Sequence, residues 1–225
     1  MKITYLGHSS FKVESDGKTV YVDPWLNGPT SPIKVNDVKK ADLVLVTHDH
    51  GDHGYQEAIE ICKKTGACFI AINELAIQAK DEEGLENVHM LNIGGSVNVG
   101  GIDVTLVQAF HSCETGSPTG FIVKFPSDSF YHAGDTGLFA TMELFGELYD
   151  IDVFMVPIGG YYTIDLRQAA LATKLVKPKV VIPMHYNTFP LIEANPEKFR
   201  DAVSETAPEV KVEILVPGLS KDLVF

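Results

Sequence analysis

The segment Thr47-His48-Asp49-His50-Gly51-Asp52-His53 holds several side chains that can bind a metal within a few positions. These side chains are His48, His50, Asp52 and His53. The apolar, β-branched run Leu43–Val46 before the segment predicts a buried strand. The residues after it repeat apolar side chains at helical spacing over 55–65, which predicts an amphipathic helix. The cluster is therefore expected in a turn at the carboxyl end of a strand, where α/β proteins usually bind ligands.

The spacing within this segment indicates two groups of ligands. His48 and His50 are two positions apart, so in an extended segment both rings face one side and can bind one cation. Asp52 and His53 follow the turn and face another direction, so they can bind a second cation. In the alternative interpretation, Asp52 caps the next helix and the histidines are solvated. We favour metal binding, because three of the 8 histidines of the chain rarely fall in this register by chance.

Further residues that can bind a metal follow strand-like runs elsewhere. His111, Asp135 and His185 each come after an apolar stretch. Strands of one sheet bring such ends to a common edge, so these residues are expected to meet the first cluster. The predicted ligands are His48, His50 and His111 for one ion, Asp52, His53 and His185 for another, and Asp135 as a carboxylate able to bridge.

This set of ligands predicts hydrolytic chemistry. Structural zinc sites are usually closed and Cys-rich, whereas nitrogen and oxygen ligands without a thiolate describe open sites. Two ions about 3.5–4 Å apart can share a hydroxide, because metal binding lowers the pKa of water toward roughly 7. Hydrolysis by a dinuclear, metal-bridged hydroxide is the expected reaction, with Asp52 as ligand and proton acceptor. Zinc is the expected metal, and Mn, Ni or Fe would suit the same ligands.

Three residues near the N-terminus each have two interpretations. Gly7 interrupts the first strand and could aim His8 into the pocket, or His8 is a hydrogen-bonded structural residue. Asp23 either orients a ligand imidazole or forms a turn. The Pro-, Gly- and Asn-rich segment 24–36, which carries Trp25, is either a pocket wall or a packed surface loop.

Composition limits the partners and the compartment. The chain has 225 residues, a length at which one domain over residues 1–225 is expected. A net charge of −12 disfavours a broad surface for nucleic acid or anionic membranes. Three cysteines without a C-x-x-C pair fit a reducing compartment and core thiols. Without a signal-like start or a long apolar run, a cytoplasmic location is expected.

The remaining pattern alternates strands and helices. Residues 1–23 are expected to form a hairpin around Asp16-Gly17, and the tail 211–216 a last strand. A loose rhythm, residues 1–115 and then 116–225, suggests two β-α halves with helices outside two sheets. The predicted helices lie at 54–65, 73–80 and 166–176.

The ligand motifs resemble those of the metallo-β-lactamase superfamily over essentially the whole chain. They are His48-Asp49-His50-Gly51-Asp52-His53, His111, Gly134-Asp135-Thr136 and His185. The resemblance implies an α/β fold, a four-layer αββα sandwich with a dinuclear site between the sheets.

Other segments are similar to a narrower family, the uncharacterised metal-dependent hydrolases of UPF0173 type, which are related to ascorbate-6-phosphate lactonases. These segments are Tyr5–Phe11, Asp23-Pro24-Trp25, His111-Ser112, Tyr131–Thr136 and Pro157-Ile158-Gly159-Gly160. The likeness favours a catalytic role for His8 in the pocket and a structural role for His132.

Three functions compete on this basis. The leading hypothesis is a hydrolase that cleaves an ester, lactone or phosphodiester of a small molecule. The alternatives are a metal-dependent nuclease or phosphodiesterase acting on nucleic acid, and a metal-binding sensor without turnover. Substrate choice is expected to depend on the loops 159–163 and 186–195, where Tyr161 and Tyr162 either pack or donate to the substrate. No nucleic-acid or membrane partner is expected, and homo-oligomerisation stays open.

Overall fold

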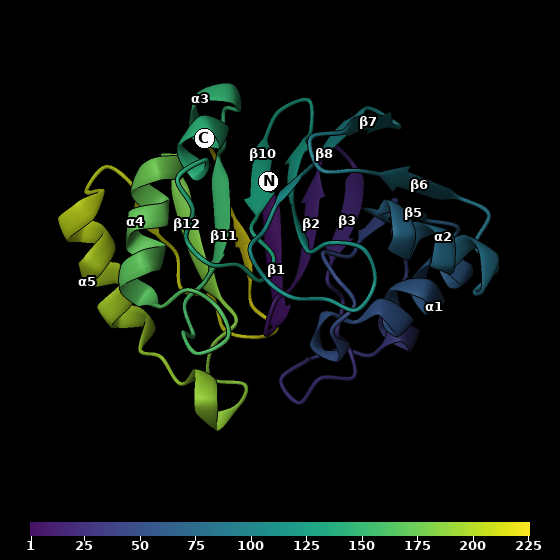
Figure 1. Ribbon diagram of the computed structural model, residues 1–225, viewed down its shortest axis with the longest axis horizontal. Coiled ribbons are helices and arrows are strands. Elements are labelled where there is room, and N and C mark those ends of the chain that lie inside the picture. Colours follow the sequence, from purple (N-terminus) through teal and green to yellow (C-terminus); the bar gives the residue numbers. More distant parts are fainter.

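Two seven-stranded sheets lie face to face in the structure, a computed structural model that describes residues 1–225, and helices cover their outer sides (Figure 1). The helices α1 and α2 flank the first sheet, and α4 and α5 flank the second. This arrangement is the predicted four-layer αββα sandwich. The helices are α1 (Tyr55–Thr65), α2 (Asn73–Asp81), α3 (Met142–Leu148), α4 (Leu166–Val176) and α5 (Pro196–Thr206).

The first sheet has the order β14-β1-β2-β3-β4-β5-β6. Asp16 and Gly17 have φ of 50° and 74°, the conformation that a tight two-residue turn between β2 and β3 requires. The predicted N-terminal hairpin is thus confirmed. The strands of this first sheet are β14 (Ser220–Asp222), β1 (Lys2–Gly7), β2 (Ser10–Ser15), β3 (Lys18–Val22), β4 (Leu43–Leu45), β5 (Cys68–Ile72) and β6 (Val88–Leu91).

The second sheet has the order β13-β12-β11-β10-β9-β8-β7. Its central strands β10, β11 and β12 pair in parallel, and α4 makes the crossover between β11 and β12. The strands are β13 (Lys211–Val212), β12 (Val180–Met184), β11 (Val153–Pro157), β10 (Ser129–His132), β9 (Thr119–Lys124), β8 (Ile102–Gln108) and β7 (Ser96–Val99).

The second sheet separates two apolar cores. Phe130 packs in the core that fills the space between the sheets and reaches under α1 and α2. Its neighbour Tyr131 packs in the other core, beneath α3, α4 and α5. The alternation follows from the two-residue period of a strand. Because both faces of these strands are covered, their sequences are almost uninterrupted apolar runs.

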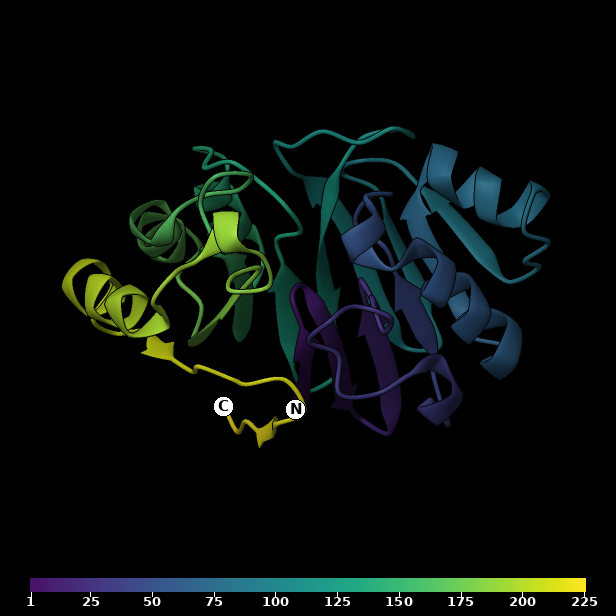
Figure 2. The same cartoon turned by 90° about the horizontal axis from the view of Figure 1, so that it is seen from below.

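Several predictions about the elements are wrong. The two halves do not divide at residue 115, because β7 and β8 already belong to the second sheet and β14 returns to the first. The helices α3 and α5 and the strand β7 were not predicted, and the tail forms two short strands rather than one strand over 211–216. The termini lie together beside β1 (Figure 2), where the Met1 amine donates to the carbonyl of Leu223 at 3.0 Å.

No helix combines the length and the apolar character needed to span a bilayer.

Candidate metal centre

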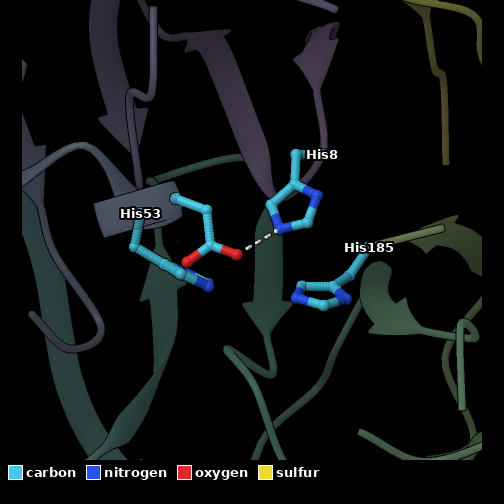
Figure 3. A group of neighbouring side chains, drawn as sticks. His8, His53 and His185 are labelled. Carbon is cyan, nitrogen blue, oxygen red and sulfur yellow. Dashed lines mark hydrogen bonds and ion pairs between the residues drawn. The ribbon is translucent and has the colours of Figure 1, made fainter. Parts of the chain in front are cut away.

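All seven predicted ligands meet at one edge of the sandwich, where strands of both sheets end. His48 follows β4 of the first sheet, while His185 follows β12 of the second. His8 follows β1 and joins them, as Figure 3 shows for His8, His53 and His185. His48 and His53 are both at 0% exposure, while His50, Asp52 and His111 are half-buried. The alternative of solvated histidines in a polar turn is therefore wrong.

One group consists of His48, His50 and His111, as predicted for one ion. Their ligand atoms lie within 4.8 Å of one another. The Nδ1 atom of His50 is 3.0 Å from Nε2 of His48 and 3.3 Å from Nε2 of His111. Three imidazole nitrogens thus converge on a small volume, which is the arrangement that a tetrahedral cation with an open position requires.

A second group consists of His8, Asp52, His53 and His185, with ligand atoms also within 4.8 Å. The sequence predicted the last three as ligands, and the structure adds His8. Its Nε2 atom is 3.1 Å from Oδ2 of Asp52, the contact drawn as a dashed line in Figure 3. His8 thus lies in the pocket, one of its two predicted positions.

Asp135 lies between the two groups. Its Oδ2 atom is 3.0 Å from Nε2 of His185 and 3.4 Å from Nε2 of His53, both in the second group. The same oxygen is 3.5 Å from Nε2 of His111 in the first group. A carboxylate that lies against both groups could bind an ion in each, which is the position expected of a ligand that bridges two ions.

Buried atoms without hydrogen-bond partners test whether a cation fits. Nε2 of His53 and Oδ1 of Asp135 are buried and have no hydrogen bond. An unsatisfied buried polar atom costs roughly 1–3 kcal/mol, so native proteins rarely keep two in one cluster. Divalent cations would satisfy both atoms, and the nitrogen and oxygen donors match zinc and related metals. The residues present therefore fit a metal centre.

Asp23 and Thr47 orient two of the imidazoles. Asp23 Oδ2 accepts from Nδ1 of His53 at 2.7 Å, which directs Nε2 of that ring into the cluster. The Thr47 hydroxyl donates to the same carboxylate at 2.7 Å and can accept from Nδ1 of His48 at 3.0 Å. Asp23 therefore orients the ring of His53, which is one of its two predicted roles. It also takes part in a turn, the other predicted role, because its carbonyl accepts from the amide of Trp25 at 2.8 Å.

Burial and charge determine the protonation of the cluster. Burial lowers the pKa of His48 and His111, and it lowers the pKa of His8 to about 4 although Asp52 opposes it. These rings are neutral near pH 7, the form that binds metals. Burial would raise the pKa of Asp135, but the charges of His185 and His53 outweigh it and hold that pKa well below its ordinary value.

The backbone around the site is constrained. His8, Asp23 and His185 have φ of 54°, 45° and 54°, a left-handed conformation that costs L-residues free energy. The His185 amide donates to the carbonyl of His8 at 2.8 Å, so the ends of β12 and β1 are tied together.

His132 is fully buried, and its Nε2 lies 2.9 Å from the carbonyl of Ser9, in agreement with its predicted structural role.

The segment 24–36 and the predicted specificity segment 186–195 border the site. The rings of Trp25 and Phe189 lie 5.4 Å and 5.7 Å from the ring of His8, so the segment 24–36 forms a wall of the pocket. Tyr161 and Tyr162 are 74% and 53% exposed. Their predicted role as donors to the substrate stays a prediction.

Sequence reasoning missed residues that act through other residues. Thr188 Oγ1 is 2.9 Å from Nδ1 of His8, a contact across 180 positions for which the sequence holds no signal. Asp49 accepts from the amide of Glu114 at 2.9 Å and so ties the loop after His111 to the metal turn. Asp49 lies between His48 and His50 in the segment 47–53. A carboxylate between two candidate ligands is the sequence signal that could have indicated its role.

Comparisons with known proteins agree with this geometry. The beta-lactamase superfamily domain matches residues 2–185. A UPF0173 metal-dependent hydrolase of Caldivirga maquilingensis is 48% identical over 217 residues, which cover 96% of this chain and 95% of that protein. A second UPF0173 metal-dependent hydrolase, from Methanopyrus kandleri, is 48% identical over 229 residues, and the match covers 98% of this chain and 99% of that protein.

A solved structure is also similar. Igni18, a metallo hydrolase from Ignicoccus hospitalis, has a TM-score of 0.92 and 45% identity, and the match covers 100% of this chain and 98% of that one. The chain therefore belongs to the metallo-β-lactamase superfamily and, within it, to the UPF0173 family of metal-dependent hydrolases.

Proposed function

We propose that this enzyme hydrolyses an ester, lactone or phosphodiester bond of a small molecule at two divalent cations, with zinc as the first expectation. The observation that carries the proposal is the position of Asp135. Its Oδ2 atom lies 3.5 Å from an imidazole of the first group and 3.0 Å from one of the second. A single carboxylate between two ligand groups favours two neighbouring ions over one.

Each ion has its own side chains in this proposal. Asp135 would contact both ions, and the bound cations would lower the pKa of a water molecule toward roughly 7 and stabilise negative charge on the substrate. Burial would lower the pKa of His53, but Asp135 and Asp23 outweigh it and raise that pKa, so an ion that binds there would displace a proton from this ring. The deprotonated imidazoles and ionised carboxylates would then supply the lone pairs. The first ion would be held by His48, His50 and His111, and the second by Asp52, His53 and His185.

Other side chains prepare the site. Burial would raise the pKa of Asp52, but the hydrogen bond with His8 and the charge of His53 outweigh it, so that this pKa lies below its ordinary value. Asp52 is therefore ionised and can accept a proton from a water molecule in the site. His8 keeps Oδ2 of Asp52 in place through Nε2, and Asp23 does the same for the ring of His53 through Nδ1.

The charge of the molecule favours a small substrate. With a net charge of −12, the surface repels polyanions such as RNA and DNA at long range. A small ester, lactone or phosphodiester carries little charge and is repelled far less. We therefore expect no nucleic-acid partner.

The test combines metal analysis with a panel of chromogenic esters, lactones and phosphodiesters. His50→Ala and Asp135→Ala are expected to lose both bound metal and hydrolysis, because each removes a ligand. The control is His89→Ala, since His89 lies on β6 and belongs to none of the ligand groups. Full activity in protein stripped of metal, or in both ligand variants, would contradict the proposal.

A further inference from the structure

A cavity of about 300 Å³ adjoins the candidate metal centre at His8. It is lined by 11 residues. Most come from β1 and the residue after it, the segment after β12 and the segment between β13 and β14, and Thr30 and the first residue of α5, Pro196, complete the lining. We propose that this cavity binds an aliphatic chain of the substrate and so determines the substrate class. The proposal rests on the proposed hydrolase function and makes it more specific.

The chemistry of the lining points to an uncharged, apolar ligand. None of the 11 lining residues is Asp, Glu, Lys or Arg, although charged residues make up 21% of the chain. Cavities of about 740 Å³ and 440 Å³ elsewhere on the molecule each contain several lysines and acidic residues. Ile214, Leu215 and Val216 supply apolar side chains to the smaller cavity. Small-molecule pockets are usually lined in this way.

Most polar atoms in the lining already have partners. The Tyr5 hydroxyl donates to the carbonyl of His8 at 2.9 Å, and Thr188 Oγ1 contacts Nδ1 of His8 at 2.9 Å. Asn187 Oδ1 accepts from the amide of Ala194 at 2.9 Å. A polar ligand would compete with these bonds, whereas a hydrocarbon chain leaves them intact.

His8 connects the cavity with the metal centre. It lines the cavity, and its Nε2 atom is 3.1 Å from Oδ2 of Asp52. Its ring centre is 4.0 Å from that of His185. His8 is the one residue of the candidate metal centre that lines the cavity, so a chain bound there would lie against its ring. We expect the bond next to the chain to reach the ligands past this ring, which is the positioning that catalysis needs.

The walls are held in place by the protein itself. Asn187 has a φ of 57°, and its amide donates to the carbonyl of Ile192 at 2.9 Å. On the other side, the Gly218 amide donates to the carbonyl of Tyr5 at 2.8 Å. A preformed cavity loses little conformational entropy when a ligand enters. Most of the free energy gained from apolar contacts therefore contributes to affinity.

Size limits the chain length. At roughly 30 Å³ for each water-sized group, the cavity holds about eight to ten non-hydrogen atoms. Burial of one methylene group improves binding by about two- to fourfold. Affinity is therefore expected to rise along a series of chains up to about eight carbons and to rise no further beyond that length.

The first experiment measures binding without turnover. Calorimetry follows butan-1-ol, hexan-1-ol and octan-1-ol binding to the metal-loaded protein and to Ile214→Trp, which fills the cavity. The matched control is Ile93→Trp, because Ile93 is 41% exposed and is not among the residues that line the cavity. We expect affinity to increase with chain length in the wild type and in the control, and to fall at least tenfold for octan-1-ol in Ile214→Trp.

The second experiment measures hydrolysis of 4-nitrophenyl esters from acetate to decanoate, in which water adds across the acyl bond to give 4-nitrophenol and the acid. We expect kcat/KM to rise two- to fourfold per methylene up to octanoate. Ile214→Trp should remove this rise, whereas the control Ile93→Trp should keep both the rise and the acetate rate of the wild type. Ile214→Ala, which enlarges the cavity, should move the optimum to longer chains.

The outcomes separate the two proposals. Hydrolysis of all esters without dependence on chain length, together with octan-1-ol binding that Ile214→Trp leaves intact, would overturn the cavity proposal and retain the hydrolase. Binding of octan-1-ol that Ile214→Trp abolishes, with no hydrolysis of any substrate class, would support the cavity and contradict the hydrolase function.

Discussion

At the scale of single residues, the site depends on pairs in which one side chain orients another. Asp23 is fully buried and accepts hydrogen bonds from His53 and from both the amide and the hydroxyl of Thr47. Such partners hold a ligand in one tautomer and one orientation. The orientation of candidate ligands such as His53 is therefore determined by residues that need not touch a metal.

Replacement of Asp23 by Asn tests this dependence. The Asn side chain lacks the charge that holds Nδ1–H of His53, so the ring loses its defined tautomer. We expect metal affinity to fall about 10- to 100-fold, measured by competition with a chromogenic chelator. Asp103→Asn, an exposed change on β8, should leave affinity unchanged. Equal affinity in Asp23→Asn and wild type would contradict the orienting role.

The cysteines give a prediction about pH. Burial raises the pKa of Cys62 to about 12 and that of Cys68 to about 11, while Cys113 is partly exposed. Only thiolates react with disulfide reagents, so one thiol per chain should react in the native protein at pH 8. Burial also raises the pKa of Cys113, so its rate should increase with pH beyond the ordinary thiol range. Cys113→Ser should abolish the fast reaction. A second fast-reacting thiol in the native protein would contradict the prediction that only Cys113 reacts.

At the scale of elements, turns place the ligands at the ends of strands. Asp135 follows β10 through Gly134, which has a φ of 61°. A Cβ at this position would lie 2.5 Å from the carbonyl oxygen of Thr119 on β9. Glycine is therefore needed for the turn that brings Asp135 to both ligand groups.

Gly134→Ala is expected to destabilise the protein by about 2–4 kcal/mol, because it adds backbone strain and a clash with main-chain atoms. Denaturant unfolding measures the change, and metal affinity should fall with it because Asp135 moves. Gly137→Ala is the control, since a Cβ there would meet Phe110 only at 3.7 Å. Similar unfolding midpoints for both variants would contradict this reading of the turn.

Prediction of elements succeeded where local signals were strong. The helix α4 begins after Asp165, which accepts from the amides of Arg167 and Gln168, and its predicted bounds 166–176 are those observed. The helix α5 has comparable signals, since Asn195 caps it and Pro196 opens it, although it is absent from the sequence prediction. The strand β7 alternates polar and apolar residues, but it is only four residues long, so its pattern is too short to be distinctive.

At the scale of the whole molecule, the candidate metal centre joins the two sheets. His48 follows β4 in the first sheet, and His185 follows β12 in the second. Backbone bonds also cross here, because the Thr119 amide on β9 donates to the carbonyl of Thr47 at 3.0 Å. Ligands from both sheets would make metal binding a contribution to the stability of the complete fold.

Metal removal should therefore lower the unfolding temperature. A ligand that binds only the folded state stabilises it by about 2.7 kcal/mol at a free concentration of 100 times its Kd. Calorimetric scans with zinc and after chelation measure the difference. His89→Ala should retain the shift and His50→Ala should lose most of it. An identical transition with and without metal would contradict binding across both sheets.

The sequence by itself determined that the protein is a metal-dependent hydrolase and which His and Asp side chains are candidates for its metal ligands. An apolar strand followed by His or Asp is a local pattern, so it can be recognised from the order of residues alone. The members of each predicted group lie together, with His8 added to the second group. A third set links the two groups and consists of His48, His53 and Asp135.

Only the tertiary structure decided that His8 joins the second group, that Asp23 orients His53, and that Thr188 and Ile214 line a cavity beside them. His8 and Thr188 are 180 positions apart. The physical reason is that periodicity describes neighbours within one strand or helix, whereas such distant contacts exist only after two sheets have packed and their ends have met.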